Sequence, residues 1–305
     1  MSLEKRVFLI EKNPKSAGEN LAINQICIDL IKNNKYEVIA RAYYHKKGVI
    51  LGNSESYFDI YEDFCNKNQY EIVRRASGGS AILVDPNLVL CYSIFFNCNN
   101  ENLGKDLTNI YKNITIPLAK NLGKNFSVEG AYYLRTKING ISVPLAGHAM
   151  KIHNQEIVQF DGVINRTSFE IEELSKVIKL RELYYYEGKN CIISDCEAFE
   201  LSGKKINNFD YSKATFLRSE KIELKKVVGL KEIGISDNHF LDVLFNTLEC
   251  LFGNLNKVNN IKIYKNTINK FHEEIKKDTK GGNRILLGHC FVDLIEPESR
   301  IHYGV

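Results

Sequence analysis

The sequence predicts an α/β protein with one principal domain and a small C-terminal extension. Segments with the two-residue apolar period of a strand alternate with segments that have the three-and-four spacing of a helix. The chain has 305 residues, enough to bury a large core. Neither an internal repeat nor a low-complexity linker divides it, so residues 1–278 are expected to form one domain and residues 279–305 the extension.

The first elements are a strand, a helix and a hairpin. A strand is expected over residues 6–10, where apolar residues run together. A helix is expected over 16–33, because apolar residues recur at helical spacing and Ser16, with an acid three residues later, has the form of a capping box. Two further strands, 37–44 and 49–52, are joined by a polar turn and are predicted to form a hairpin.

The middle of the chain is expected to be mostly strands, interrupted by one long helix. That helix covers residues 105–122, where leucine, isoleucine and tyrosine recur every three or four positions. The pair Asn139-Gly140 is the strongest hairpin signal in the sequence. The strands are expected at 71–75, 80–84, 88–96, 128–134, 141–151 and 156–164.

The last third contains three predicted helices and one segment without a regular pattern. The helices are expected over residues 168–180, 236–252 and 261–280, each with apolar residues at helical spacing. Residues 184–210 are rich in tyrosine and are interpreted as an irregular insertion.

The composition excludes some classes of function. Hydrophobic residues make up 44% and charged residues 26% of the chain, with a formal net charge of +4, which is typical of an ordinary enzyme. Acidic residues interleave with basic ones even in the densest charged run, so no nucleic-acid partner is expected. No apolar run is long enough for a membrane span, and the first residues do not have the form of a signal peptide, so a cytoplasmic location is expected.

The eight cysteines are scattered along the chain and several lie within apolar patterns. This distribution favours buried reduced thiols over a disulfide framework. Four residues could be imagined as a zinc site, but their spacing is poor, and unrelated thiols are the better interpretation. Those four residues are Cys191, Cys196, His289 and Cys290.

The segment RRASGGSAILVD at positions 74–85 is the strongest functional signal. Its arginines carry fixed positive charge, its double glycine lets a backbone approach a ligand closely, and the apolar residues that follow are typical of a buried strand. It matches neither the phosphate loop nor the dinucleotide fingerprint. It predicts an anion site on a strand turn, with one arginine facing the ligand and the other facing solvent or a helix. The alternative is a tight hairpin with surface arginines.

This segment resembles the lipoate-protein ligase and octanoyltransferase branch of the biotin and lipoate protein ligase superfamily. That branch has R-R-x-[ST]-G-G-x-A-V-x-x-D and then a strand ending in Y-S or L-S, which is similar to residues 74–85 and 91–93 here. The resemblance covers about residues 6–180, and loosely extends to 278. It implies a central mixed sheet flanked by helices, with lipoyl- or octanoyl-adenylate between the glycine turn and the second hairpin. Further matches are E-N-L-A at 19–22, V-I-L-G at 49–52 and A-G-x-A-x-[KR] at 146–151.

The resemblance also assigns candidate site residues. The arginines, serine and glycines of the turn would frame the acyl and phosphate groups, three more residues would line or brace the site, and the A-G-H-A-M-K segment would cover the adenylate. Asp161 is a weaker candidate, as a carboxylate that meets Mg²⁺ through the phosphates, as one that orients an incoming amine, or as a structural residue. The other candidates are Arg74, Arg75, Ser77, Gly78, Gly79, Ala81, Asp85, Ser93, Gly147, His148, Ala149 and Lys151.

The sequence departs from the family at one important position. The family has an essential lysine in K-[VIF]-[SA]-G, and Pro144 stands there instead, so neither a charge nor a backbone donor is present. Lys137, on the other arm of the hairpin, is the hypothesised substitute, because a cross-strand neighbour reaches nearly the same point. The alternative is a solvated strand lysine. No cysteine lies between Cys98 and Cys191, which disfavours the thioester route of the cysteine-dependent transferases.

The resemblance therefore implies a lipoate-protein ligase-like enzyme. It would use ATP and Mg²⁺ to activate lipoate or octanoate as acyl-AMP. It would then transfer the acyl group to a lysine of a lipoyl carrier protein, either a lipoyl domain or a glycine cleavage H protein. One alternative is a family member without ligase chemistry that binds an acyl or acyl-nucleotide ligand or a carrier protein. Another is an acyltransferase that acts on a different substrate.

Overall fold

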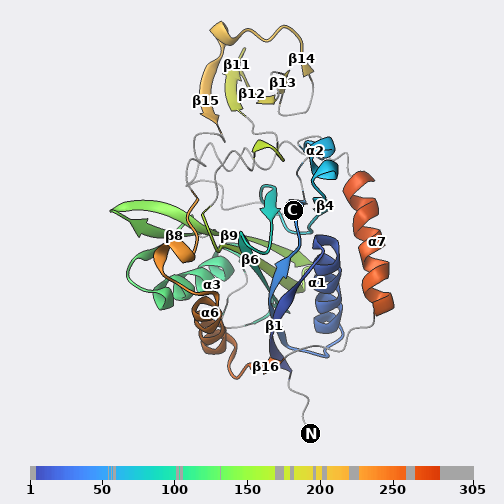
Figure 1. The fold of residues 1–305 in the computed structure, drawn as a ribbon, viewed down its shortest axis with the longest axis vertical. Helices are drawn as coiled ribbons and strands as arrows, with labels where there is room; N and C mark the ends of the chain where they lie inside the picture. Colours follow the sequence, from blue (N-terminus) through green and yellow to red (C-terminus); the bar gives the residue numbers. More distant parts are fainter. Residues whose placement is uncertain are drawn as a thin grey trace.

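A large mixed sheet forms the centre of the protein (Figure 1). The computed structural model describes residues 5–281 except 54, 56, 58–59, 101–102, 104–105, 131, 169–174, 179–181, 195–196, 201–204, 220–226 and 259–264. Within that part the sheet has eight strands in the order β16-β1-β2-β6-β10-β9-β8-β7. Strand β1 is parallel to β2 and β16, and the other neighbours are antiparallel. The strands are β1 (Arg6–Lys15), β2 (Val38–His45), β6 (Val89–Asn97), β7 (Phe126–Glu129), β8 (Tyr133–Ile138), β9 (Ile141–His153), β10 (Ile157–Asn165) and β16 (Asn256–Val258).

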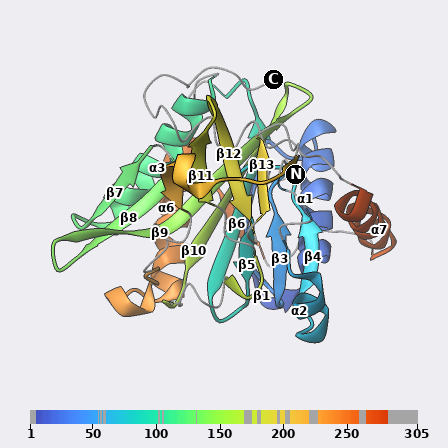
Figure 2. The same ribbon diagram turned by 90° about the horizontal axis from the view of Figure 1, so that it is seen from above.

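Helices cover both faces of this sheet. Helix α1 (Ala17–Lys32) lies on one face with α7 (Lys265–Gly281) packed along it, and α3 (Leu107–Leu122) and α6 (Asp237–Phe252) lie on the other (Figures 1 and 2). The N-terminus of α1 is capped as predicted, because the Ser16 hydroxyl accepts a hydrogen bond of 3.1 Å from the backbone N–H three residues later. The predicted mixed sheet flanked by helices is therefore confirmed.

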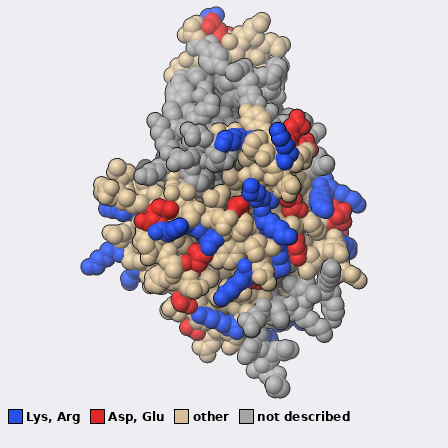
Figure 3. Space-filling model, viewed as in Figure 1, with Lys and Arg blue, Asp and Glu red and all other residues tan. Residues whose placement is uncertain are grey.

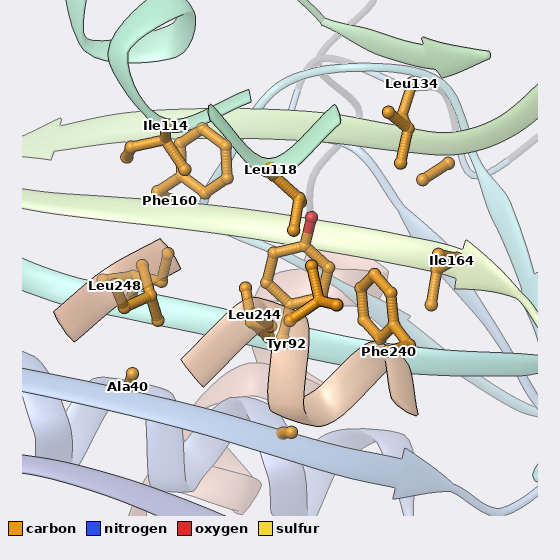
Figure 4. Packing of buried hydrophobic residues seen from close by; sticks show 14 of the residues in the cluster. Ala40, Tyr92, Ile114, Leu118, Leu134, Phe160, Ile164, Phe240, Leu244 and Leu248 are labelled. Carbon is orange, nitrogen blue, oxygen red and sulfur yellow. The ribbon is translucent and has the colours of Figure 1, made fainter. Parts of the chain in front are cut away.

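The largest part of the core lies between the sheet and the α3–α6 pair. Aromatic and aliphatic side chains from strands and helices interdigitate there, and each contributes roughly 1.5–3 kcal/mol by leaving water (Figure 4). Tyr92 lies flat against Gly162 on the neighbouring strand, where an added Cβ would come within 2.1 Å of the ring. Only glycine at position 162 allows this packing. The labelled residues are Ala40, Tyr92, Ile114, Leu118, Leu134, Phe160, Ile164, Phe240, Leu244 and Leu248.

A second, smaller sheet lies next to α1 and carries the glycine turn. It has the order β4-β3-β5, with β3 (Gly48–Leu51) parallel to β4 (Glu71–Arg74) and antiparallel to β5 (Ile82–Val84). The predicted hairpin between residues 37–44 and 49–52 is therefore wrong. Both edges of β2 are already paired, with β1 and β6, so the chain passes to the other sheet at residues 46–47.

The second predicted hairpin is confirmed, although the strand before it is shorter than expected. Asn139 and Gly140 both have positive φ, of 50° and 79°, as a two-residue turn between β8 and β9 requires. The expected strand over 128–134 is divided into β7 and β8, and Gly130 lies between them with a φ of 59°. Strand β9 is long, so the β8–β9 hairpin projects from the body of the molecule (Figure 1).

The tyrosine-rich segment is not an irregular insertion. It contributes to a third sheet of five strands within the described residues, which lies at one end of the molecule and faces the viewer in Figure 2. The sequence signal was available, because tyrosine favours strands and Glu187-Gly188, with φ of 49° and 80°, makes a hairpin turn. The strands are β11 (Glu182–Tyr186), β12 (Lys189–Ser194), β13 (Glu197–Glu200), β14 (Lys205–Ile206) and β15 (Thr215–Ser219).

The remaining described elements are short. They are α2 (Glu62–Lys67) and the 3₁₀ turns η2 (Tyr211–Lys213) and η3 (Lys231–Ile233). Most of the helix expected over 168–180, and the tail after residue 281, lie outside the described residues. Basic and acidic side chains are interspersed on the face shown in Figure 3. Among the helices described, none combines the length and the apolar character that crossing a membrane requires.

Candidate functional site

The glycine turn, residues Ser77 to Ser80, joins β4 to β5 and packs against the end of β3. The carbonyl of Ser77 accepts a hydrogen bond of 3.0 Å from the N–H of Asn53. Gly52 lies directly beneath the turn, and a Cβ there would come within 1.8 Å of the Gly79 carbonyl oxygen. Gly79 itself has a φ of 86°, which disfavours any residue with a side chain. The turn therefore depends on glycine at both contact positions.

Both arginines that precede the turn are buried: the exposed fraction is 6% for Arg74 and 8% for Arg75. Arg74 donates to the carbonyls of Gly52 and Glu55, at 2.9 and 2.6 Å. Its own N–H donates to the hydroxyl of Thr279 on α7, at 3.0 Å. The expectation that one of the two arginines faces solvent is wrong, because both are buried and both donate to backbone carbonyls, Arg74 through one terminal nitrogen and Arg75 through all three guanidinium nitrogens.

Arg75 determines which way the peptide groups of the turn point. Its guanidinium donates to the carbonyls of Ile50, Gly78 and Ser80, at 3.1, 2.6 and 2.9 Å. Every described peptide bond is trans, so the N–H of a peptide group points away from its carbonyl. The N–H groups of Gly79 and Ala81 therefore point away from the buried guanidinium. Such a set of aligned N–H groups is suited to an anion.

Asp161, at the centre of β10, is tied to the glycine turn. Its Oδ2 accepts a bond of 2.7 Å from the Ser77 hydroxyl, and its Oδ1 accepts a bond of 2.7 Å from the Ser93 hydroxyl on β6. The amide of Gln159 donates to both oxygens, at 3.1 and 2.9 Å. Each carboxylate oxygen has two acceptor positions, so these four bonds use the capacity of the group. The geometry gives no support to the expectation that Asp161 meets Mg²⁺ or orients an amine.

A buried polar network extends from Asp161 to α1, and sequence reasoning missed most of it. The amide of Asn24 donates to the hydroxyls of Tyr43 and Ser93, each at 3.2 Å. The guanidinium of Arg41, which is fully buried, donates to the Asn24 side chain and pairs with Glu11 at 2.6 Å. The available signal was a polar residue inside a strand whose neighbours are all apolar, because such a residue needs a buried partner.

Strand β9 brings three predicted residues to the same side of the sheet as Asp161. Ala149 pairs with Asp161, Lys151 pairs with Gln159, and Gly147 is two residues further along β9. Cross-strand partners share a face of the sheet. A Cβ added at Gly79 would lie 4.0 Å from that of Ala149, so the glycine turn comes close to this part of β9.

His148 points to the opposite side of the sheet, which corrects its expected place beside the adenylate. Its Nδ1 lies 2.7 Å from the carbonyl of Tyr132 and its Nε2 contacts the Tyr92 hydroxyl. A carbonyl only accepts, so Nδ1 carries the proton and Nε2 accepts from Tyr92. Burial lowers the pKa of His148 to about 4, so the ring is neutral at pH 7. The side chain belongs to the core beside Phe160.

Lys137 does not lie opposite Pro144, so the cross-strand argument for it is wrong. Lys137 pairs with Ser142, and the residue opposite Pro144 is Arg135. The register shifts because Leu145 is bulged out of the ladder, and a bulge is a place where a strand tolerates proline. Arg135 donates to the Ser142 hydroxyl at 3.0 Å.

Two other predicted residues support local structure. Ala81 packs against the cluster of Val49 and Leu51. The Asp85 carboxylate accepts a 2.8 Å bond from the N–H of Asn87 in the turn before β6. Among the described residues, no group of three histidine, cysteine or acidic side chains is placed to hold a metal. Cys191 lies in β12, and the other three residues of the imagined zinc site fall outside the described part.

Comparison with known proteins identifies the family. Residues 16–193 match the lipoyl protein ligase A/B catalytic domain. No curated protein matches the chain. A bipartite lipoate protein ligase from Thermoplasma acidophilum, described with its E2 lipoyl domain, has a similar fold, with a TM-score of 0.62, 14% identity, and coverage of 93% of this chain and 97% of the other.

Two further solved structures have a similar fold. LipL1 of P. falciparum, in complex with lipoate, has a TM-score of 0.59 and 15% identity over 90% of this chain and 74% of its own. A lipoate-protein ligase A bound with ATP has a TM-score of 0.59 and 14% identity over 93% of this chain and 99% of its own. The family match covers more than half of the sequence, and the chain therefore belongs to the lipoyl protein ligase A/B catalytic domain family.

Proposed function

We propose that this protein is a lipoate-protein ligase-like enzyme that activates lipoate or octanoate with ATP and transfers the acyl group to a lysine of a lipoyl carrier protein. The observation that carries the proposal is the glycine turn, whose N–H groups point away from Arg75 and whose backbone lies close to Ala149. The ligands come from the similar structures, of which one is in complex with lipoate, one is bound with ATP and one is described together with its E2 lipoyl domain.

The reaction has two steps. The carboxylate of the acid attacks the α-phosphorus of ATP, which forms acyl-AMP and releases pyrophosphate. The amine of the carrier lysine then attacks the acyl carbonyl, loses a proton, and expels AMP to leave an amide. Negative charge develops on phosphate oxygens in the first step and on the carbonyl oxygen in the second. The N–H groups of the glycine turn are suited to phosphate oxygens, which are charged before the reaction as well as in the transition state. A cation aimed at the developing charge stabilises it without reorganisation.

Lys151 is the cation that we assign to the developing charge. It lies on the same side of the sheet as Asp161, opposite Gln159. Within the described residues its ammonium makes neither a hydrogen bond nor an ion pair. Burial lowers the pKa of nearby His153, the bond to Gln159 raises it, and the charge of Lys151 lowers it again, which supports an ammonium close to this cluster.

The described side chains do not form a Mg²⁺ site. Magnesium prefers carboxylate oxygens and water, and the acceptor positions of Asp161 are filled by Ser77, Ser93 and Gln159. The described part also lacks any cluster of three metal-binding side chains. No step proposed here depends on a metal held by the protein.

The test is pyrophosphate release from ATP with lipoate, octanoate and biotin supplied separately. We expect release with lipoate or octanoate, followed by a mass increase of an added lipoyl domain equal to one acyl group. The carrier lysine changed to alanine is the control and should gain no mass. Absence of pyrophosphate with every acid would contradict the ligase proposal.

One observation favours a second candidate, a family member that binds an acyl-nucleotide or a carrier protein without ligase chemistry. Pro144 occupies the position of the family lysine, and Lys137 pairs with Ser142 instead. If this candidate is right, acyl-AMP binds tightly while pyrophosphate is never released. Turnover with any of the three acids excludes it.

A further inference from the structure

The hydrogen bonds around Asp161 have only one consistent direction. Ser93 has a single hydroxyl proton, and this proton goes to Oδ1 of Asp161 because a carboxylate only accepts. Burial raises the pKa of Tyr43, so its phenol keeps its proton and donates to Ser93 across 2.9 Å. Asn24 also donates to Ser93, which fills both acceptor positions of that hydroxyl. Asp161 is therefore held in one orientation by the sheet and α1.

The only member of this network on the glycine turn is Ser77, within the described residues. Ser77 is fully buried and its hydroxyl donates to Asp161 Oδ2, whereas Gly79 and Ser80 are exposed. The turn is thus attached to the large sheet through this one side-chain bond. Its other side-chain attachment, through Arg75, leads back to the small sheet.

We propose that Asp161 is a positioning residue that latches the glycine turn to the large sheet through Ser77. This latch, the hydrogen bond from Ser77 to Asp161, fixes the N–H groups of the turn relative to Ala149 and Lys151 on β9. A single acyl-nucleotide can then accept hydrogen bonds from donors on both sheets. A bound anion would otherwise have to order the turn itself, and that ordering lowers affinity. This inference rests on the proposed function for its ligand, but the latch itself can be tested without one.

The first test compares hydrogen exchange in Ser77→Ala and Ser93→Ala proteins. Both changes remove one buried hydroxyl from the same carboxylate, but only Ser77 lies on the turn. We expect exchange of the Asn53 amide, whose N–H donates to the Ser77 carbonyl at 3.0 Å, to become at least about tenfold faster in Ser77→Ala, which is the usual effect of losing one hydrogen bond to a charged group. In Ser93→Ala this amide should exchange as in the unmodified protein. Equal acceleration in both proteins overturns the latch.

The second test separates positioning from simple destabilisation. In the pyrophosphate assay we expect Ser77→Ala to raise the KM for ATP and for the acid about tenfold with kcat changed less than about twofold, because the turn binds ground state and transition state alike. A purely structural role lowers the folded fraction, so the maximal rate falls and KM is unchanged. Thr115→Val is the matched control, since it removes a buried hydroxyl on α3, on the far side of the sheet.

Asp161→Asn keeps the test decisive if Ser77→Ala does not fold. Asparagine offers one acceptor oxygen where Ser77 and Ser93 now use two, so the Asn53 amide should again exchange faster, by less than in Ser77→Ala. Where Ser77→Ala does fold, the protein with both Ser77→Ala and Asp161→Asn should exchange as Ser77→Ala alone does, because both changes act on the same Ser77–Asp161 bond. Unaltered exchange in Asp161→Asn overturns the latch. Faster exchange without any pyrophosphate activity in the unmodified protein keeps the latch and rejects the ligase proposal.

Discussion

Arg75→Lys tests the most informative feature of the site, a guanidinium that donates hydrogen bonds to three backbone carbonyls. Arg75 makes four hydrogen bonds, through Nε and both terminal nitrogens, to Ile50, Gly78 and Ser80. Lysine keeps the positive charge but presents its donors from a single nitrogen on a flexible stem. The substitution therefore removes the planar set of guanidinium donors and leaves the positive charge in place.

The expected cost follows from the bonds that a single ammonium cannot make. Losing two of the four bonds costs about 3 kcal/mol, at about 1.5 kcal/mol for each buried bond to a charged donor. Solvent does not replace them, because Arg75 is only 8% exposed. The chain has 305 residues, and at an unfolding entropy of about 2.1 cal/mol/K per residue a loss of about 3 kcal/mol lowers the melting temperature by about 5 °C. The freed carbonyls of Gly78 and Ser80 also let the peptide groups turn, so the KM for ATP should rise about tenfold.

Thermal unfolding and the pyrophosphate assay measure these two effects. Arg6→Lys is the matched control, because Arg6 pairs with Glu37 at 2.8 Å, donates to one backbone carbonyl, that of Phe252, and is 41% exposed, so this change should cost clearly less than Arg75→Lys. A melting temperature for Arg75→Lys equal to that of Arg6→Lys would refute the assigned bonds. A lower melting temperature with an unchanged KM would show that Arg75 supports the fold without orienting the turn for a ligand.

Three further predictions follow from the same geometry. Lys151→Ala should lower the rate of pyrophosphate release about a hundredfold, the usual effect of removing one group that stabilises developing charge. Lys137 is exposed and pairs with Ser142, so Lys137→Ala should retain most of the rate. A larger loss of rate in Lys137→Ala than in Lys151→Ala would reject our assignment. Gly52→Ala places a methyl group against the Gly79 carbonyl and should lower the free energy of unfolding by about 1–3 kcal/mol and raise the KM for ATP. An unchanged KM would contradict the packing of the turn on Gly52. The pKa of His148 is about 6.5 in the unfolded chain, and burial lowers it to about 4 in the folded protein, so between these values only the unfolded chain takes up the proton. The contribution of His148 to stability is therefore complete above pH 6.5 and falls as the pH drops toward 4, by at most about 2 kcal/mol at pH 5. The melting temperature of a His148→Gln protein should fall less between pH 7 and pH 5 than that of the unmodified protein.

Local signals in the sequence predicted local structure well. Ser16 caps α1 as its capping box predicted, the helix expected over 236–252 forms as α6, and Asn139-Gly140 turns the hairpin between β8 and β9. These features depend on residues within three or four positions of each other, so the pattern contains the whole interaction. The same holds for the position of the glycine turn between two strands.

The pairing of strands was the source of two errors. Residues 37–44 and 49–52 have the pattern of a hairpin, but β2 already has partners on both edges and β3 pairs with β4 and β5. Likewise, one bulged residue, Leu145, shifts the register by one position and places Arg135 opposite Pro144. Neither competition for a partner nor a bulge is visible in the period of a single strand.

The sequence by itself determined the family of this protein, the α/β class of its fold and the place of the glycine turn, because these depend on residue types and short spacings. Only the tertiary structure decided what the marked residues do. Arg74 and Arg75 lie in the interior and hold backbone carbonyls, and His148 faces the core. Asp161, a weak candidate in the sequence, joins the two sheets through Ser77. A buried charge must be satisfied by whatever the fold brings to it, and those partners come from segments far apart in the chain.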